Sequence, residues 1–154
     1  MSSSQESLVV EVAFEIEKDA EGYPKSRNAE ALLCKPLDTE CSLCVVVSVP
    51  FYLRNVAYGD TITTEDTASG SLEFKEIVKR GGYNVYRILL HDSKKKDELI
   101  SRLLHFDVII EQDDNLIAFA VPSTADLDTI VNFILEGKDK GLWGAQDGYI
   151  CEAS

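Results

Sequence analysis

The chain has 154 residues, 45% of them hydrophobic and 27% charged, which is enough for one domain or two packed subdomains and too apolar for disorder. The net charge of −12 is divided equally between residues 1–80 and 81–154. Such a surface repels nucleic acid and anionic membranes and attracts basic proteins. The sequence has no secretion signal, no apolar run of membrane-helix length and four cysteines, which predicts a soluble, cytoplasmic protein with free thiols.

Short strands dominate the first half of the chain. Residues 1–7 are polar and are expected to be disordered. Residues 8–16 read as a half-buried strand, with Glu11 and Glu15 on one face and an apolar period-two face formed by Leu8, Val10, Val12, Phe14 and Ile16. A charged stretch closed by Gly22 and Pro24 predicts a turn. Further strands are expected at residues 28–35, 41–49, 59–65 and 71–79. Their spacing predicts an antiparallel β subdomain over residues 8–80, either a small sheet or a partly open barrel.

Helical periodicity enters after Gly81-Gly82. The expected elements are a strand at residues 83–90, a helix at 94–106 capped by Asp92 or Ser93, a hairpin of 107–111 and 116–121, a helix from a Ser123–Asp126 capping box to Gly141, and a strand at 142–151. This order is that of a split βαβ unit. It predicts a C-terminal ferredoxin-like βαββαβ subdomain over residues 81–154, packed on the first subdomain, and the α+β fold class.

Groups that carry catalysis are scarce. The two histidines, His91 and His105, have no nucleophile motif near them in the sequence. The pair Cys41-x-x-Cys44 has the spacing of a metal knuckle, but it lies in a predicted strand, where residues three apart point to opposite faces, and no second pair accompanies it. We therefore predict no catalytic residues, no metal and no cofactor.

Aromatic and acidic residues near predicted loops and edges suggest a binding surface instead. Protein interfaces use aromatic anchors ringed by complementary charge, although each aromatic here is equally compatible with a role in the core. The candidate partner-binding residues are Tyr52, Tyr58, Glu65, Asp66, Glu111, Asp113, Asp114, Trp143, Asp147 and Tyr149.

Several segments resemble a bacterial domain-of-unknown-function family. The resemblance is carried by Glu21-Gly22-Tyr23-Pro24, Ala29 to Leu32, Pro50 to Asp60 with the pattern Pro-Phe-x-x-Arg-x-Val-x-Tyr-Gly-Asp, Phe119 to Pro122, Gly141-Leu142-Trp143 and Asp147-Gly148. Leu32-Leu33 departs from the family, which has a Trp there. Some members are similar to immunity proteins encoded beside Rhs-type polymorphic toxins, including toxins that look like ADP-ribosyltransferases.

The resemblance implies a protein that binds and neutralises a cognate secreted toxin by covering its active cleft. Its partner would be a basic toxin domain bound one-to-one, with no role for nucleic acid or membrane. Two alternatives stay open at this point: a small-molecule or peptide-binding sensor that uses the C-terminal half, and an enzyme that uses His91 or His105.

Overall fold

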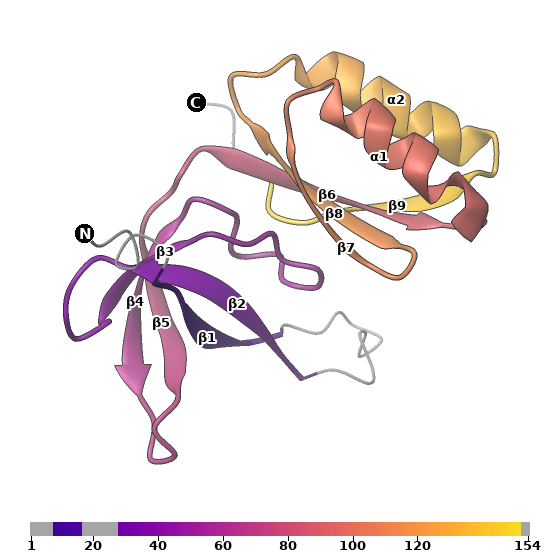
Figure 1. Ribbon diagram of the computed structural model, residues 1–154. Helices are drawn as coiled ribbons and strands as arrows, with labels where there is room; N and C mark the ends of the chain where they lie inside the picture. Colours follow the sequence, from indigo (N-terminus) through magenta and orange to yellow (C-terminus); the bar gives the residue numbers. More distant parts are fainter. Residues whose placement is uncertain (1–7, 17–27, 152–154) are drawn as a thin grey trace, which may run out of the picture.

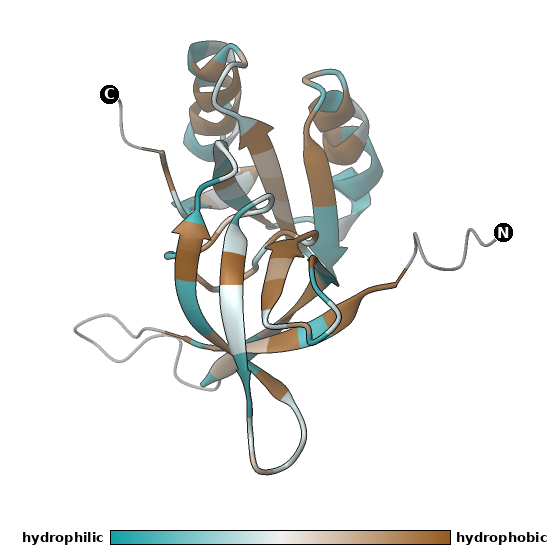
Figure 2. Ribbon diagram, turned by 90° about the vertical axis from the view of Figure 1, so that its left-hand side faces the viewer, coloured by the Kyte–Doolittle hydropathy of each residue, from teal (hydrophilic) through white to brown (hydrophobic). Residues whose placement is uncertain are grey.

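The structure is a computed structural model that describes residues 8–16 and 28–151. Its elements in chain order are β1 (Val10–Glu15), β2 (Ala29–Pro36), β3 (Leu43–Val46), β4 (Thr61–Asp66), β5 (Leu72–Lys79), β6 (Tyr83–Leu90), η2 (Ser93–Lys95), α1 (Lys96–Leu104), β7 (Ile109–Asp113), β8 (Leu116–Pro122), α2 (Leu127–Asp139) and β9 (Trp143–Asp147). Strands β1 to β5 form a closed barrel, and the other four form a sheet of order β7-β8-β6-β9. The two α-helices cover one face of this sheet, and the barrel lies on its other side (Figures 1 and 2).

The barrel is built from strands with alternating burial. Neighbouring strands pair antiparallel, except that β1 also pairs with β5 in parallel, with Val12 opposite Leu72. The rings of Phe14 and Phe74 stack across this junction with their centroids 4.7 Å apart. The barrel interior is therefore closed by a contact between residues about 60 positions apart in the sequence. Its buried residues are Val12, Phe14, Ile16, Leu32, Cys34, Cys44, Val46, Leu53, Val56 and Ile62.

Both helices pack an apolar stripe on the sheet. The carboxylate of Asp92 accepts a hydrogen bond from the Lys94 N–H, which confirms the predicted cap of the first helical segment. The second helix is capped by Asp126, whose carboxylate accepts from the Thr129 N–H. The predicted capping box that began at Ser123 is therefore wrong, because a turn over residues 122–125 separates Ser123 from the helix. Gly141, at φ +75°, follows the C-terminal end of the second helix, as predicted.

The predicted fold class is also corrected. Strands account for 43% and helices for 19% of the described residues, so the protein is mostly β and not α+β. The sequence predicted an N-terminal small sheet or partly open barrel and a C-terminal ferredoxin-like subdomain. The structure instead has a closed five-stranded barrel and a second, four-stranded sheet. Periodicity reveals the type of each element, but the long-range pairing of β1 with β5 leaves no signal in it. The predicted disorder at residues 1–7 and the turn at Gly22 and Pro24 lie outside the described residues.

The barrel and the sheet share a small apolar core. The loop of residues 47–60, between β3 and β4, contributes Val49 and Ala57, which pack on Val85 of β6 and on two alanines of β8. The chain crosses from barrel to sheet between the end of β5 and the start of β6. The segment of residues 47–60, which holds the Pro-Phe-x-x-Arg-x-Val-x-Tyr-Gly-Asp pattern, is thus the main connection between the two halves.

Candidate functional site

Two rows of side chains cross the face of the sheet that points to the barrel. Cross-strand partners in a sheet point to the same face, so the register defines each row. The first row is Glu111, Ala118, Arg87 and Gln146, on β7, β8, β6 and β9 in turn. The second row, one step further along the strands, is Asp113, Leu116, Leu89 and Gly144.

The first row is tied to the loop of residues 47–60. The Glu111 carboxylate accepts a hydrogen bond of 2.7 Å from the Val49 N–H. The Arg87 guanidinium donates through Nε to the Pro50 carbonyl at 3.2 Å and through Nη2 to the Leu53 carbonyl. From the barrel side, the Glu30 carboxylate accepts from the N–H groups of Phe51 and Tyr52, at 2.7 and 3.0 Å. The backbone of this loop is therefore held between three charged side chains.

Burial controls the electrostatics of this junction. Arg87 is 2% exposed, and its Nη1 has no hydrogen-bond partner among residues 8–16 and 28–151. Desolvation lowers the pKa of Arg87 to about 10, with Glu30 acting in the opposite direction, so the guanidinium remains charged at neutral pH. Desolvation also raises the pKa of Glu111, and the nearby Glu30 adds to this shift. Arg87 is buried and Glu30 and Glu111 are half-buried, and all three bond to the backbone of the loop from beneath.

The second row forms the floor of an open groove. The side chain of Leu89 is 52% exposed, and open space lies above Gly144, where an added Cβ would meet no atom within 4 Å. Phe51 and Tyr52 of the loop form one wall, and the turn between β7 and β8 forms the rim. We call this hollow of about 650 Å³ the acid groove; its lining residues are Phe51, Tyr52, Leu89, Asp113, Asp114, Asn115, Leu116 and Gln146.

The groove combines apolar surface with unneutralised carboxylates. Asp113 and Asp114 are exposed, and no salt bridge to them is formed within the described part of the chain. Asp114 has a left-handed backbone at φ +52°, which Asp and Asn tolerate better than other side chains with a Cβ. An apolar floor beside two free carboxylates favours a ligand that is both apolar and cationic.

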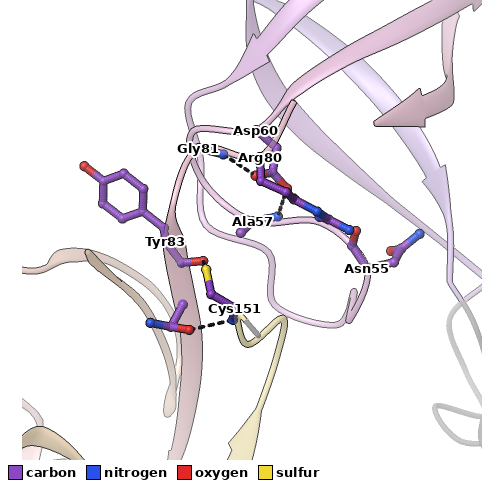
Figure 3. Close-up of polar contacts among 8 residues, drawn as sticks. Asn55, Ala57, Asp60, Arg80, Gly81, Tyr83 and Cys151 are labelled. Atoms are coloured by element: carbon purple, nitrogen blue, oxygen red, sulfur yellow. Dashed lines mark hydrogen bonds and ion pairs between the residues drawn. The ribbon is translucent and has the colours of Figure 1, made fainter. Parts of the chain in front are cut away.

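A second polar cluster fixes the end of the same loop (Figure 3). Asp60 is 1% exposed, and its carboxylate accepts from the N–H groups of Ala57 and Gly81, at 3.0 and 2.9 Å. The guanidinium of Arg80 donates to the same carboxylate at 2.8 Å and to the Asn55 carbonyl at 2.9 Å. Since Asp60 has all these partners within the fold, its role is to join the loop to the crossing from barrel to sheet.

The structure brings together only part of the predicted binding surface. Tyr52, Asp113 and Asp114 line the acid groove. Glu111 lies beside the groove but bonds to the loop backbone, and Trp143 is a core residue, 6% exposed, whose indole N–H donates to the Ile134 carbonyl at 2.9 Å.

The other predicted residues lie elsewhere. Tyr58 packs edge-on against Tyr83 with centroids 5.0 Å apart, and the ring of Tyr149 lies 4.0 Å from the Arg80 guanidinium. Glu65 and Asp66 are exposed at the far end of β4, and Asp147 is exposed at the end of β9. Sequence reasoning missed the groove residues Phe51, Leu89, Asn115, Leu116 and Gln146. Because β6 reads as an almost continuous apolar run, its sequence holds no sign that Leu89 is exposed.

The histidines and cysteines form no reactive constellation in the described residues. The Nδ1 atoms of His91 and His105 lie 3.0 and 2.8 Å from the backbone carbonyls of Gly141 and Ser101. Burial raises the pKa of Cys34 to about 12 and that of Cys44 to about 11, so both thiols are protonated at neutral pH. Among residues 8–16 and 28–151, no three His, Cys, Asp or Glu side chains are grouped to hold a metal ion. None of the described helices is long and apolar enough to cross a membrane.

Comparison with known proteins places this fold in a family. The family model described as "Domain of unknown function (DUF4265)" matches residues 32–145, which include the loop of residues 47–60 and all residues that line the acid groove except Gln146. The chain belongs to the DUF4265 family. No curated protein is significantly similar to it.

A solved structure from Neisseria gonorrhoeae, described as a hypothetical protein, has the same fold as this DUF4265 protein. The two superpose with a TM-score of 0.74 over 95% of this chain and 98% of that one, at 14% sequence identity. Neither the family nor this relative carries an enzymatic description.

Proposed function

We propose that this DUF4265 protein is an immunity protein that binds and neutralises a cognate secreted polymorphic toxin, and that the acid groove is its docking surface. The observation that carries the proposal is the groove itself, with Leu89 and Leu116 as an apolar floor and Asp113 and Asp114 as an unpaired acidic rim. A net charge of −12 steers the whole molecule toward a basic partner. The Pro50 to Asp60 segment resembles the domain-of-unknown-function family, and the similarity of some members of that family to immunity proteins of Rhs-type toxins supplies the class of partner.

The groove suggests how a toxin would be blocked. Enzymes that act on nucleotides, ADP-ribosyltransferases among them, hold substrate phosphates with cationic side chains. Carboxylates of the groove rim that pair with those cations would exclude the substrate by competition. The complex would be one-to-one, because one groove covers one active cleft, and it requires no chemistry from the immunity protein.

The experiment that tests this proposal compares two charge changes of equal size. The product of the neighbouring gene, the candidate toxin, is expressed with and without the protein, and the affinity between the two is measured by calorimetry. The groove variant is Asp113→Lys with Asp114→Asn, which keeps a residue that tolerates φ +52° at position 114. The control is Glu65→Lys with Asp66→Asn on β4, on the side of the barrel away from the sheet (Figure 1).

We expect the groove variant to bind the toxin about 100-fold more weakly or worse, which is equivalent to about 2.7 kcal/mol. It should also no longer protect the growth of cells that express the toxin. The control should stay within about threefold of the wild type, since isolated surface charges contribute about 0–1 kcal/mol. Absence of binding by the wild type would refute the function. Equal losses in both variants would show that net charge acts without the groove.

A small-molecule sensor is the second candidate, and the size of its site argues against it. The hollow between α1 and α2, over Phe133 and Trp143, has a volume of about 170 Å³. Pockets for small ligands usually measure about 300–1,000 Å³. Part of its rim is also occupied, because Arg102 lies 4.9 Å from the Phe133 ring and Lys140 bonds to Glu136. The acid groove, at about 650 Å³, lies within this range, but it is an open surface hollow with exposed carboxylates, which favours a protein segment over an enclosed small ligand.

A further inference from the structure

Strand β9 is an edge of the four-stranded sheet. It pairs with β6 alone in the described part of the chain. Two hydrogen bonds, from the His91 N–H to the Leu142 carbonyl and from the Gly148 N–H to the Val85 carbonyl, establish which residues of this strand bond to β6. Hydrogen-bonded residues alternate along an antiparallel strand. The backbone N–H and C=O groups of Ala145 and Asp147 therefore point away from β6, toward the open edge.

A hollow lies on each face of this edge strand. The acid groove reaches β9 at Gln146 on the barrel side. On the helix side, a second hollow of about 360 Å³ lies between β9 and α2. The two large apolar side chains Leu135 and Ile150, which are 46% and 37% exposed, line it, together with Lys138 and Asp147 at its margin. We call it the apolar hollow. Gln146 lines both hollows, so β9 separates them.

This arrangement matches the geometry of an added strand. The side chains of a β-strand point alternately to the two faces of its sheet. A strand paired with β9 would direct every second side chain toward the apolar hollow and the others toward the acid groove. Natural proteins usually protect a free edge with Lys, Pro or a bulge, yet Trp143–Asp147 contains neither Lys nor Pro.

We propose that the partner docks by adding an extended segment to β9, with apolar side chains in the apolar hollow and basic side chains at the β9 end of the acid groove, over Gln146. The proposal rests on the proposed function and names the binding mode of the same surface. Charge decides the occupant, because the strand ends at the exposed Asp147 and the whole molecule carries a net charge of −12. A second copy of this chain would bring another −12 to the edge, whereas a basic segment neutralises it. Main-chain hydrogen bonds would supply affinity and the two hollows would supply specificity.

The test removes one outward donor and leaves the fold in place. Ala145→Pro deletes an N–H that β6 does not use, and proline is tolerated on edge strands where the N–H faces outward. The matched control is Ala145→Ser, which keeps the N–H at nearly the same size. Thermal unfolding of both variants verifies that they are folded. Against the toxin domain encoded by the adjacent gene, we expect Ala145→Pro to weaken binding by about tenfold or more and Ala145→Ser to stay within about threefold of the wild type.

A second arm does not depend on the toxin. A synthetic octapeptide of alternating leucine and lysine is added to the isotope-labelled protein, and amide hydrogen exchange is followed by NMR. Slower exchange at Ala145 and Asp147 is the expected result. The outcomes separate the two proposals: a wild-type protein that ignores the toxin refutes the immunity function, whereas binding that Ala145→Pro leaves unchanged refutes strand addition and leaves the function standing. Peptide binding without slower exchange at these two amides, or no peptide binding, also overturns strand addition.

Discussion

Glu111 and Arg87 lie in one row of the sheet, yet each bonds to the backbone of the loop above it. Charged side chains that hydrogen-bond to its backbone fix the distance of a loop from the sheet, because a buried N–H or C=O without a partner costs about 1–3 kcal/mol. The loop in turn carries Phe51 and Tyr52, which wall the acid groove. At the residue scale, the shape of the groove depends on side chains that do not themselves line it.

Glu111 provides a pH-dependent test of this arrangement. Its pKa is raised above the ordinary value of 4.5, chiefly by burial, so the folded state binds the proton more tightly than the unfolded chain does. The free energy of unfolding therefore falls as the pH rises from about 4.5 through the raised pKa, and this loss persists above it. Glu111→Gln keeps an acceptor for the Val49 N–H but cannot ionise. We therefore expect its free energy of unfolding, relative to that of the wild type, to increase as the pH rises through this range.

Urea unfolding at a series of pH values measures this difference. The exposed Glu73→Gln serves as the control, since it should run parallel to the wild type. A Glu111→Gln curve that is also parallel to the wild type would show that desolvation of this carboxylate does not limit stability.

Sequence reasoning chose the candidate residues by chemical type, and the structure places only three of them together. It selected Tyr52, Asp113 and Asp114, which the structure brings together in the acid groove. Trp143 was selected on the same chemical grounds and is buried. Trp143 and Tyr52 have the same amphipathic character, and only the packing of α2 on β9 buries the first of them, which is a long-range fact.

At the scale of the elements, local patterns predicted most strands and both helices but not how they join. The period-two face that holds Val12 and Phe14, opposite Glu11 and Glu15, marks β1 correctly. Closure of the barrel depends on two residue pairs, Val12 with Leu72 and Ala13 with Glu73, and on the stacked ring of Phe74. These contacts carry no periodic signal, so the sequence predicted only a small sheet or a partly open barrel.

Phe14 allows the closure to be tested. Its side chain is 1% exposed and stacks on Phe74, so Phe14→Ala removes the contact that spans the junction and leaves a cavity. We expect a loss of about 3–5 kcal/mol in the free energy of unfolding, measured by chemical denaturation. Val78→Ala on β5, where the side chain is 56% exposed, should cost less than about 1 kcal/mol. Similar losses for the two variants would mean that the junction contributes little.

At the scale of the whole molecule, charge acts over distances that no single contact spans. The chain has 27 acidic and 15 basic residues, and the excess is divided between both halves. Charge of this kind accelerates the encounter with an oppositely charged partner more than it holds the complex together.

The proposed toxin complex should therefore form more slowly as salt is added. From about 0.01 M to about 1 M salt, the screening length falls from about 30 Å to about 3 Å. We expect the association rate to fall by about tenfold or more over this range, while the dissociation rate changes less. Stopped-flow mixing measures both. An association rate independent of salt would exclude electrostatic steering by the acidic surface.

The parallel pairing of β1 with β5 also bears on where the family domain begins. The match to the family starts at residue 32, within β2, and so leaves out β1 and the first part of β2. A polypeptide trimmed to that boundary would expose the backbone edge of β5 and the ring of Phe74, and a bare strand edge next to an uncovered apolar ring invites association between molecules. The conserved-domain limits are consequently narrower than the folding unit, and a gene fragment chosen to match them would encode a protein prone to aggregate.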